Sequence, residues 1–168
     1  MEKPFLKVKK LNEDAIIPSK RDEDAGYDLY GQFKEDNVIL MPGELILIPT
    51  GISIEFPRDW VFYIAERSGA GSKGIARRCG VIDSGYRGEI MVATNNTSNK
   101  PIIFFKDEHS VEEKLKEANL EKDKVILYPQ SKGIAQGMLL YCPHVEIEEV
   151  HDLADSVRGD GAWGSSGK

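Results

Sequence analysis

Asp83 is the residue whose chemistry and surroundings stand out first in this sequence. It lies in the segment Gly-Val-Ile-Asp-Ser-Gly-Tyr-Arg-Gly-Glu at 80–89, between an apolar Val-Ile pair and a Ser-Gly turn dipeptide. A hairpin of this kind would hold a carboxylate at its shoulder, with the ring of Tyr86 beside it. Such a carboxylate can orient and deprotonate a water molecule, although an Asp before Ser-Gly more commonly stabilises a turn. The segment alone leaves both roles open.

A group of potential phosphate donors lies at 67–74, in the stretch Arg-Ser-Gly-Ala-Gly-Ser-Lys-Gly. A guanidinium, a hydroxyl and consecutive backbone N–H groups are the donors that a polyphosphate needs. Glycine also allows a ligand to approach the backbone closely. The spacing is not that of a Walker A loop, so the stretch fits either a phosphate cradle or an ordinary polar loop.

The C-terminal stretch at 158–167, Arg-Gly-Asp-Gly-Ala-Trp-Gly-Ser-Ser-Gly, combines one arginine, two serines and a large aromatic ring. Trp163 could stack on a base while Arg158 and the serine hydroxyls bind phosphate. The alternative is a tail that only packs on the surface. The glycine and serine content predicts a mobile arm over 155–168.

Composition limits the classes of protein and partner. The chain has 168 residues, 40% hydrophobic and 30% charged, as expected of one globular domain. The net charge of −6 argues against a nucleic-acid-binding surface, because such a surface needs clustered Lys and Arg. The sequence has no run of about 18 apolar residues suited to a membrane span. We therefore expect neither a membrane nor a nucleic acid as a direct partner.

The cysteines and histidines bear on compartment and metal binding. Cys79 and Cys142 form neither a disulfide framework nor a metal-ligand spacing, and the three histidines lie far apart. The N-terminus carries charge throughout and lacks the apolar stretch of a signal peptide. We therefore expect a cytoplasmic protein whose side chains bind no metal directly.

The elements that must position these groups are predominantly short strands. Runs rich in Ile, Leu and Val, separated by Gly, Pro, Asn and Asp, predict strands, and Pro49 indicates a bend or an edge position. Many short strands at this spacing indicate an all-β, jelly-roll-like barrel or sandwich. One strand is predicted around Leu6 and Val8, and the others at 37–41, 44–56, 60–65, 89–94, 102–106, 125–128, 134–142 and 145–150.

One segment has a helical pattern instead. Ser-Val-Glu-Glu at 110–113 has the form of a capping box, in which Ser110 accepts an N–H bond and Glu113 reaches back. Val111 and Leu115 then share one face. We predict a short helix at about 110–119, inside an insert at about 99–124 of a β domain that spans 1–154.

Together these stretches resemble the trimeric dUTPase family, whose five motifs occur in this order. Ala-Gly-Tyr-Asp-Leu at 25–29 is similar to the first motif, and Arg-Ser-Gly at 67–69 to the second. The segment 80–89 is similar to the third and is the most specific match. Ile-Ala-Gln at 134–136 matches the core of the fourth, and 158–167 matches the fifth.

The resemblance implies a jelly-roll subunit, a homotrimer with shared active sites, and hydrolysis of dUTP to dUMP and pyrophosphate, with Mg²⁺ bound through the phosphates. This reaction keeps uracil out of DNA and supplies dUMP. Asp83 would bind the water that attacks the α-phosphorus, with Asp28 in support. Tyr86 would pack under the deoxyribose and leave no room for a ribose 2′-hydroxyl.

The remaining substrate contacts implied by the resemblance involve the other motifs. Trp163, where the family usually carries Phe, would close over the uracil. The other implied contacts are the hairpin main chain near Gly80, Val81, Ile82 and Met91 for the uracil edge, Ser68 and Gly69 beside Arg67 for the β-phosphate, Gln136 for the α-phosphate, and Arg158, Ser165 and Ser166 beside Gly164 for the γ-phosphate.

Two features depart from the family pattern. Ser131, Lys132 and Gly133 stand where the fourth motif usually has Gly-Asp-Arg, which predicts altered local architecture or altered contacts between subunits. The insert at 99–124 is also longer than in compact members and resembles extra segments of phage and some bacterial members. Its helix offers a surface for a protein partner.

Two alternatives remain beside this interpretation. A dCTP deaminase, or a bifunctional deaminase–dUTPase, shares the fold, but the hairpin of Asp83 and Tyr86 and the complete C-terminal motif favour pyrophosphatase chemistry. The second alternative is a regulatory module with this fold that binds a protein through the insert. The sequence shows no Ser-His or Cys-His pairing, so a covalent nucleophile is not favoured.

Overall fold

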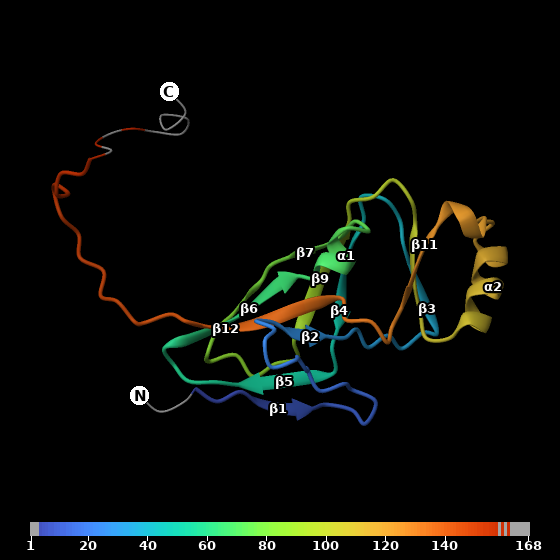
Figure 1. Cartoon of the computed structure of the whole chain (residues 1–168), viewed down its shortest axis with the longest axis horizontal. Coiled ribbons are helices and arrows are strands. Elements are labelled where there is room, and N and C mark those ends of the chain that lie inside the picture. Colours follow the sequence, from blue (N-terminus) through green and yellow to red (C-terminus); the bar gives the residue numbers. More distant parts are fainter. Residues whose placement is uncertain (1–3, 158, 160, 162–168) are drawn as a thin grey trace.

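Figure 1 shows the computed structural model of the chain, which describes residues 4–157, 159 and 161. Its strands form four small sheets, with β1 beside β5 and the orders β11-β10-β3, β2-β12-β6-β8 and β4-β9-β7. The strands pair antiparallel, except that β10 and β11 run parallel. The predicted all-β, jelly-roll-like architecture is confirmed.

The strands are short, and most lie close to predicted positions, whereas β2, β7 and β8 were not predicted as strands. They are β1 (Lys7–Lys10), β2 (Tyr27–Leu29), β3 (Asn37–Leu40), β4 (Leu45–Pro49), β5 (Ile52–Glu55), β6 (Trp60–Glu66), β7 (Ile75–Arg78), β8 (Val81–Ile82), β9 (Met91–Asn96), β10 (Ile102–Phe105), β11 (Ile126–Pro129) and β12 (Ala135–Tyr141). The helical elements are α1 (Ser68–Gly71), α2 (Glu108–Glu117) and the 3₁₀ turn η1 (Lys122–Lys124). The run at 44–56 divides at Thr50 and Gly51, where Gly51 adopts a φ of 68° that favours glycine.

The core lies between the sheets and is built from the inward-facing residues of most strands. Leu29, Ile48, Phe62 and Ile64 are at most 1% exposed. Close-packed apolar side chains of this kind supply the main driving force for folding. The sheets are therefore fixed relative to one another where they carry candidate site residues.

Strand β10 is buried on both faces. Ile102 and Phe104 face the main core, whereas Ile103 and Phe105 form a second cluster with Val111 and Leu115 of α2. Alternate residues of a strand point to opposite faces, so β10 is shared by the two clusters. Of the predicted insert at 99–124, residues 102–105 therefore belong to a sheet as β10, and Figure 1 shows α2 at the outer side of β3 and β11.

Helix α2 confirms the predicted helix but begins earlier. Asp107 is the N-cap, and its carboxylate accepts a hydrogen bond from the Ser110 N–H at 2.9 Å. The prediction that Ser110 caps the helix was therefore wrong. Both residue types are good caps, and a choice three residues upstream adds one turn to the helix.

The strand predicted at 145–150 does not form. These residues are extended but outside every sheet, and Val145 and Ile147 are 70% and 98% exposed. Figure 1 shows the chain after β12 running away from the body of the molecule, so it has no neighbouring strand to pair with. Alternation of apolar residues predicts an extended segment, but a strand also needs a partner.

Candidate active site

The Asp83 turn is held together by main-chain groups and a neighbouring arginine. The Tyr86 N–H donates to the Asp83 carbonyl at 3.0 Å. Arg87 Nη1 donates to the carbonyls of Ser84 and Tyr86 at 2.7 and 2.9 Å. The exposed Asp83 carboxylate itself accepts no hydrogen bond from the residues that the structure describes. The turn therefore does not depend on this carboxylate, which favours the chemical role over the turn-stabilising one.

Tyr86 is half-exposed but fixed in orientation. Its hydroxyl donates to the Glu89 carbonyl at 2.8 Å, and its ring lies over Gly88. A Cβ at Gly88 would come within 2.5 Å of the Tyr86 hydroxyl oxygen, closer than any real contact. Glycine at 88 therefore lets the ring fold back and present one flat face beside Asp83.

The predicted hairpin does not form, because β8 pairs with β6 whereas β9 pairs with β4 and β7 in another sheet. A pocket of about 250 Å³ adjoins the Asp83 turn, and we call it the hairpin pocket after the prediction. Its walls come from two different sheets, since β8 supplies one side and β4 and β9 the other. Small-molecule sites are commonly apolar with a few convergent polar groups. The lining residues are Leu47, Val81, Ile82, Met91 and Ala93, together with Cys79, Asp83, Tyr86 and Glu89.

A larger pocket of about 740 Å³ lies where α1 meets β2 and β12, and we call it the loop pocket. The backbone N–H groups of Ser68 and Gly69 have no acceptor among the described residues. A Cβ at Gly69 would meet nothing within 4 Å, so packing does not require glycine there. Free N–H groups beside open space suit an anion. The charged and polar residues of this pocket include Lys20, Arg21, Asp24, Asp28, Arg67, Ser68 and Gln136.

Gln136 is placed in the loop pocket by its neighbours. Its Nε2 donates to the Glu66 carbonyl at 2.9 Å, which leaves its second amide hydrogen for a ligand. A Cβ at Gly26 would lie 2.5 Å from Gln136 Oε1. The glycine of the Ala-Gly-Tyr-Asp-Leu stretch thus provides the space in which this amide is oriented.

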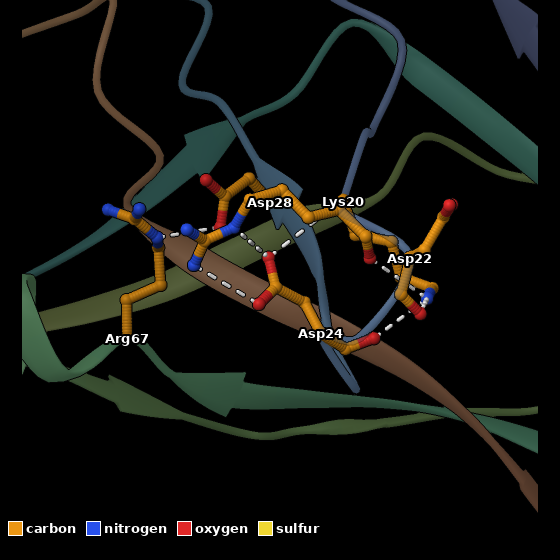
Figure 2. A network of polar contacts seen from close by, with 6 residues as sticks. Lys20, Asp22, Asp24, Asp28 and Arg67 are labelled. Carbon is orange, nitrogen blue, oxygen red and sulfur yellow. Dashed lines mark hydrogen bonds and ion pairs between the residues drawn. The ribbon is translucent and has the colours of Figure 1, made fainter.

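Asp28 and Arg67 form a half-buried ion pair at the edge of the loop pocket (Figure 2). Arg67 Nε donates to Asp28 Oδ1 at 2.7 Å, and Arg67 Nη1 donates to the Gly133 carbonyl at 3.1 Å. Burial alone would lower the pKa of Arg67, but the hydrogen bond and charge of Asp28 raise it above its ordinary value. The guanidinium is therefore charged and held in a single orientation.

A second, exposed ion pair lines the same pocket. Arg21 Nε donates to Asp24 Oδ2 at 2.9 Å, and Lys20 Nζ donates to the Asp24 carbonyl at 2.7 Å (Figure 2). The hydrogen bond from Arg21 lowers the pKa of Asp24. The sequence interpretation missed this segment. Its only signal is the alternation of charges at 20–24, which also fits an ordinary solvated loop.

The residues that stand in place of Gly-Asp-Arg, at 131–133, lie beside the pair of Asp28 and Arg67. Gly133 is buried, and its carbonyl accepts hydrogen bonds from both the Tyr128 hydroxyl, at 2.7 Å, and Arg67. A Cβ at Gly133 would lie 3.1 to 3.2 Å from Arg67 and Asp28. The glycine therefore makes the room in which this ion pair packs. Lys132 and Lys73 line an adjoining cavity of about 450 Å³, which adds positive charge beside the loop pocket.

The two pockets of one chain share no lining residue. Gln136 pairs with Ala65 of β6, whereas Ile82 pairs with Phe62 on the opposite edge of the same strand. Three residues along a strand and two strand spacings across it separate their Cα atoms by roughly 14 Å. The Asp83 turn and Gln136 of the same chain therefore lie on opposite sides of β6.

Comparison with known proteins places this geometry in a family. The dUTPase family model matches residues 12–109. A deoxyuridine 5′-triphosphate nucleotidohydrolase of Clostridioides difficile is 38% identical over 166 residues, covering 96% of this chain and 97% of that protein. The chain belongs to the dUTPase family. Another deoxyuridine 5′-triphosphate nucleotidohydrolase, of Nautilia profundicola, is 36% identical, covering 97% of this chain and 99% of that protein.

Solved dUTPase structures share the fold as well. The structure of the Staphylococcus bacteriophage 80alpha dUTPase with dUPNHPP superimposes with a TM-score of 0.75 at 25% identity, and covers 98% of this chain and 99% of that one. The resemblance read from the motifs is thus confirmed over almost the whole length of the chain. Membership of the family therefore covers nearly the whole chain, beyond the matched residues 12–109.

The structure groups the residues predicted for a dUTPase site into two sets. Arg67, Ser68, Gly69, Gln136 and Asp28 line the loop pocket, and Val81, Ile82, Asp83, Tyr86 and Met91 line the hairpin pocket, with Gly80 preceding β8. Arg158, Trp163, Gly164, Ser165 and Ser166 lie outside the described residues. Leu47 and Cys79 were missed, because only the pairing of β4 with β9 and the turn before β8 bring them to the pocket.

Metal and membrane features can be stated for the described residues. Across 4–157, 159 and 161, no three or more His, Cys, Asp or Glu side chains are placed to hold a metal ion together. In the loop pocket of this dUTPase, the carboxylates of Asp24 and Asp28 are instead engaged by arginines. Over the same residues, no helix has the length and apolarity needed to cross a bilayer.

Proposed function

We propose that this dUTPase hydrolyses dUTP to dUMP and pyrophosphate with a water molecule activated by Asp83. The observation that carries the proposal is the Asp83 carboxylate, which is exposed and uncommitted within the described residues while the turn around it is held by other groups. A general base must be free to accept a proton and to hold its water in a defined position. The neighbouring fixed ring of Tyr86 supplies a reference surface for the substrate.

The reaction is an in-line displacement at the α-phosphorus. Asp83 orients the water and accepts its proton while the new bond from oxygen to phosphorus forms and the bond to the bridging oxygen of pyrophosphate breaks. Gln136 and the N–H groups of Ser68 and Gly69 donate to the phosphate oxygens, where negative charge develops. Arg67, oriented by Asp28, and the nearby Lys73 and Lys132 add positive charge to this region.

The hairpin pocket would take the nucleoside. The main chain near Gly80 to Ile82 and Met91 would pair with the edge of uracil, and the pocket walls would exclude a methyl group at position 5. Tyr86 would lie against the deoxyribose, where its fixed ring leaves no space for a 2′-hydroxyl. Arg158, Ser165 and Ser166, beside Gly164, would hold the γ-phosphate, and Trp163 would cover the uracil.

Magnesium fits this site as an ion carried by the substrate. Two of the three acidic side chains of the loop pocket, Asp24 and Asp28, are paired with arginines, and Glu23 is exposed. Most oxygen ligands of a hard cation would therefore come from the triphosphate and from water. When bound, Mg²⁺ would neutralise phosphate charge. The side chains and N–H groups of the chain would bind the same phosphates around the magnesium ion.

Complete active sites would be shared between copies in a homotrimer. Asp83 and Gln136 must approach the same α-phosphate, but within one chain they lie on opposite edges of β6. Exposed apolar side chains provide surface to bury between copies. These include Leu45 and Leu47 on β4, and Val145, Ile147 and Leu153 on the segment after β12.

Mixing two inactive variants tests the shared site directly. Asp83→Asn and Gln136→Ala homotrimers should each be inactive, but trimers reassembled from a mixture should recover activity. With random assembly, about one quarter of sites would combine an intact hairpin pocket from one copy with an intact loop pocket from another. Activity that stayed at the level of the separate variants would contradict shared sites. Light scattering of the unmixed protein reports the subunit number.

A nucleotide panel separates the proposed activity from its alternatives. Pyrophosphate release from dUTP, with little from dTTP, dCTP or UTP, is expected. Ammonia released from dCTP would instead indicate a dCTP deaminase or a bifunctional enzyme. A protein-binding role for α2 can coexist with hydrolysis, and replacing the outward Glu112 and Glu113 by Gln would affect a protein partner without touching either pocket.

The exposed free thiols Cys79 and Cys142 suit the reducing cytoplasm, where we place the enzyme.

A further inference from the structure

The side chain of Arg77 connects the two sheets that supply the walls of the hairpin pocket. Arg77 belongs to β7, where it pairs with Thr94 of β9. Its guanidinium reaches Tyr63 of β6 in the other sheet, where Nη2 donates to the Tyr63 hydroxyl and Cζ lies 4.9 Å from the ring centroid. One side chain therefore contacts both of the sheets that supply the pocket walls.

The same guanidinium supports the main chain that leads into β8. A Cβ at Gly80 would lie 2.5 Å from Arg77 Nη1 and equally close to the Ile64 carbonyl. Gly80 is buried, and its carbonyl accepts the Ile64 N–H at 2.7 Å. Only glycine lets the chain pass this close to the arginine, so Arg77 packs against the backbone of the pocket wall itself.

Apart from Arg77, few contacts fix the distance between strand β8 and the opposite wall of the pocket. It is two residues long, and its ladder consists of Phe62 with Ile82 and Tyr63 with Val81. The opposite wall, at Met91 and Ala93, belongs to β9, the strand to which β7 is paired. The contact between Arg77 and Tyr63 therefore spans the junction across which the width of the pocket is defined.

The guanidinium of Arg77 is held without an ion pair in the part of the chain that the structure describes. Within the described residues, no carboxylate lies at ion-pair distance from its guanidinium, and its buried Nε has no hydrogen-bond partner. A partly buried cation is compensated here by the face and hydroxyl of Tyr63. An apolar side chain would avoid the desolvation penalty, but it could not donate a hydrogen bond across the two sheets.

We propose that Arg77 is a positioning residue that sets the width of the hairpin pocket and so selects a pyrimidine without a substituent at position 5. Arg77 acts through Tyr63 and the Gly80 backbone and does not touch the substrate. The inference rests on the proposed function, since it takes the hairpin pocket as the base site. It adds to that function the structural cause of base discrimination.

The first test measures discrimination between dUTP and dTTP. Arg77→Ala should raise KM for dUTP far more than it lowers kcat, and should reduce the preference for dUTP over dTTP by about tenfold, the scale of one methyl group. Arg77→Lys keeps the charge but loses the planar guanidinium, and should recover part of the preference. Tyr63→Phe should shift the preference in the same direction by less.

The matched control is Arg78→Ala. Arg78 is the next residue on β7, is exposed, and donates to Asn95 Oδ1 at 3.3 Å on the sheet surface. Its loss should leave the preference unchanged. If Arg77→Ala does not fold, Arg77→Lys and Tyr63→Phe decide the question. If kcat/KM for dUTP relative to kcat/KM for dTTP is the same in these variants as in the parent, the inference is overturned.

The second test reads the pocket without turnover. Cys79 lines the hairpin pocket and is exposed, so in a Cys142→Ser background dUMP should protect it from alkylation by iodoacetamide. Arg77→Lys should need a higher dUMP concentration for the same protection. Equal protection in both proteins would overturn the role of Arg77. No protection by dUMP in the parent protein would instead refute the assignment of this pocket to the base.

Discussion

Arg67 and Asp28 lie 39 positions apart in the chain and meet at 2.7 Å between Nε and Oδ1. Each side chain is about 30% exposed, and both pack on the bare backbone of Gly133. The pair thus joins three segments that the sequence keeps separate, those of β2, α1 and the turn before β12. The pair lies at the edge of the loop pocket, where we propose that phosphate binds.

Breaking this pair should affect both stability and substrate binding. Asp28→Asn leaves the guanidinium partly desolvated without its counter-charge, so we expect a loss of about 1 kcal/mol in the free energy of unfolding and a higher KM for dUTP. Urea unfolding and steady-state kinetics measure the two effects. Arg21→Ala breaks the exposed pair with Asp24 and serves as the control, with no measurable change in stability expected. Equal stability of Asp28→Asn and the parent would contradict a structural role for the pair.

Asp83→Asn should abolish turnover while nucleotide still binds. The amide keeps the shape of the side chain but cannot accept the proton of the attacking water, so we expect kcat to fall by about 10² to 10⁴. Calorimetric titration with a non-hydrolysable dUTP analogue should give a dissociation constant close to that of the parent. Asp123→Asn, on η1 and remote from both pockets, is the control. A kcat near the parent value in Asp83→Asn would exclude Asp83 as the base.

Gly88→Ala should impair the rejection of ribonucleotides. The added methyl group would lie 2.5 Å from the Tyr86 hydroxyl oxygen, so the ring must move from its hydrogen bond to the Glu89 carbonyl. We expect kcat/KM for UTP relative to dUTP to rise. Gly85→Ala in the same turn provides the control, because a Cβ there meets nothing within 4 Å. The same UTP to dUTP ratio in both variants would show that the position of Tyr86 does not gate the sugar.

Alkaline pH should weaken the protein partly through Tyr128. Burial raises the pKa of Tyr128 above its ordinary value of about 10, and the nearby Arg67 only partly opposes this. The folded chain therefore holds the phenolic proton more tightly than the unfolded chain. The corresponding stability is complete below pH 10 and is lost as the pH rises through the raised pKa.

Tyr128→Phe checks the alkaline prediction. The variant should be less stable at neutral pH, because the Gly133 carbonyl loses the hydroxyl that donates to it at 2.7 Å. Its free energy of unfolding should then decline less steeply than that of the parent above pH 10. Parallel declines in urea titrations across this range would mean that Tyr128 does not contribute to the alkaline transition.

Much of the fold followed from local pattern. Runs of Ile, Leu and Val located most strands because their alternation reports one buried face, and the Ser-Gly dipeptide located the turn after Asp83. Family motifs located part of the lining of each pocket. The segment at 145–150 has the same alternation but no partner strand, and the first turn of α2 has two equally good caps, so pattern alone gave the wrong answer at both places.

The connections between distant segments were not predictable. Nothing near Arg77 in the sequence indicates that its guanidinium stacks on Tyr63, and nothing near Gly133 indicates that it makes room for Arg67. These contacts depend on which sheets meet and at what register, which is a property of the whole chain. The charges at 20–24 likewise became part of a pocket only once β2 was paired with β12.

Strand β10 has a consequence for how the outer helix can vary. Ile103 and Phe105 of β10 pack against Val111 and Leu115 on the inner side of α2. Substitutions at Val111 or Leu115 would therefore destabilise the sheet of the catalytic domain. The outer side, which carries Glu112 and Glu113, has no such constraint. During evolution, substitutions should therefore accumulate slowly on the inner side of this helix and quickly on its outer side, where contacts with new protein partners can form.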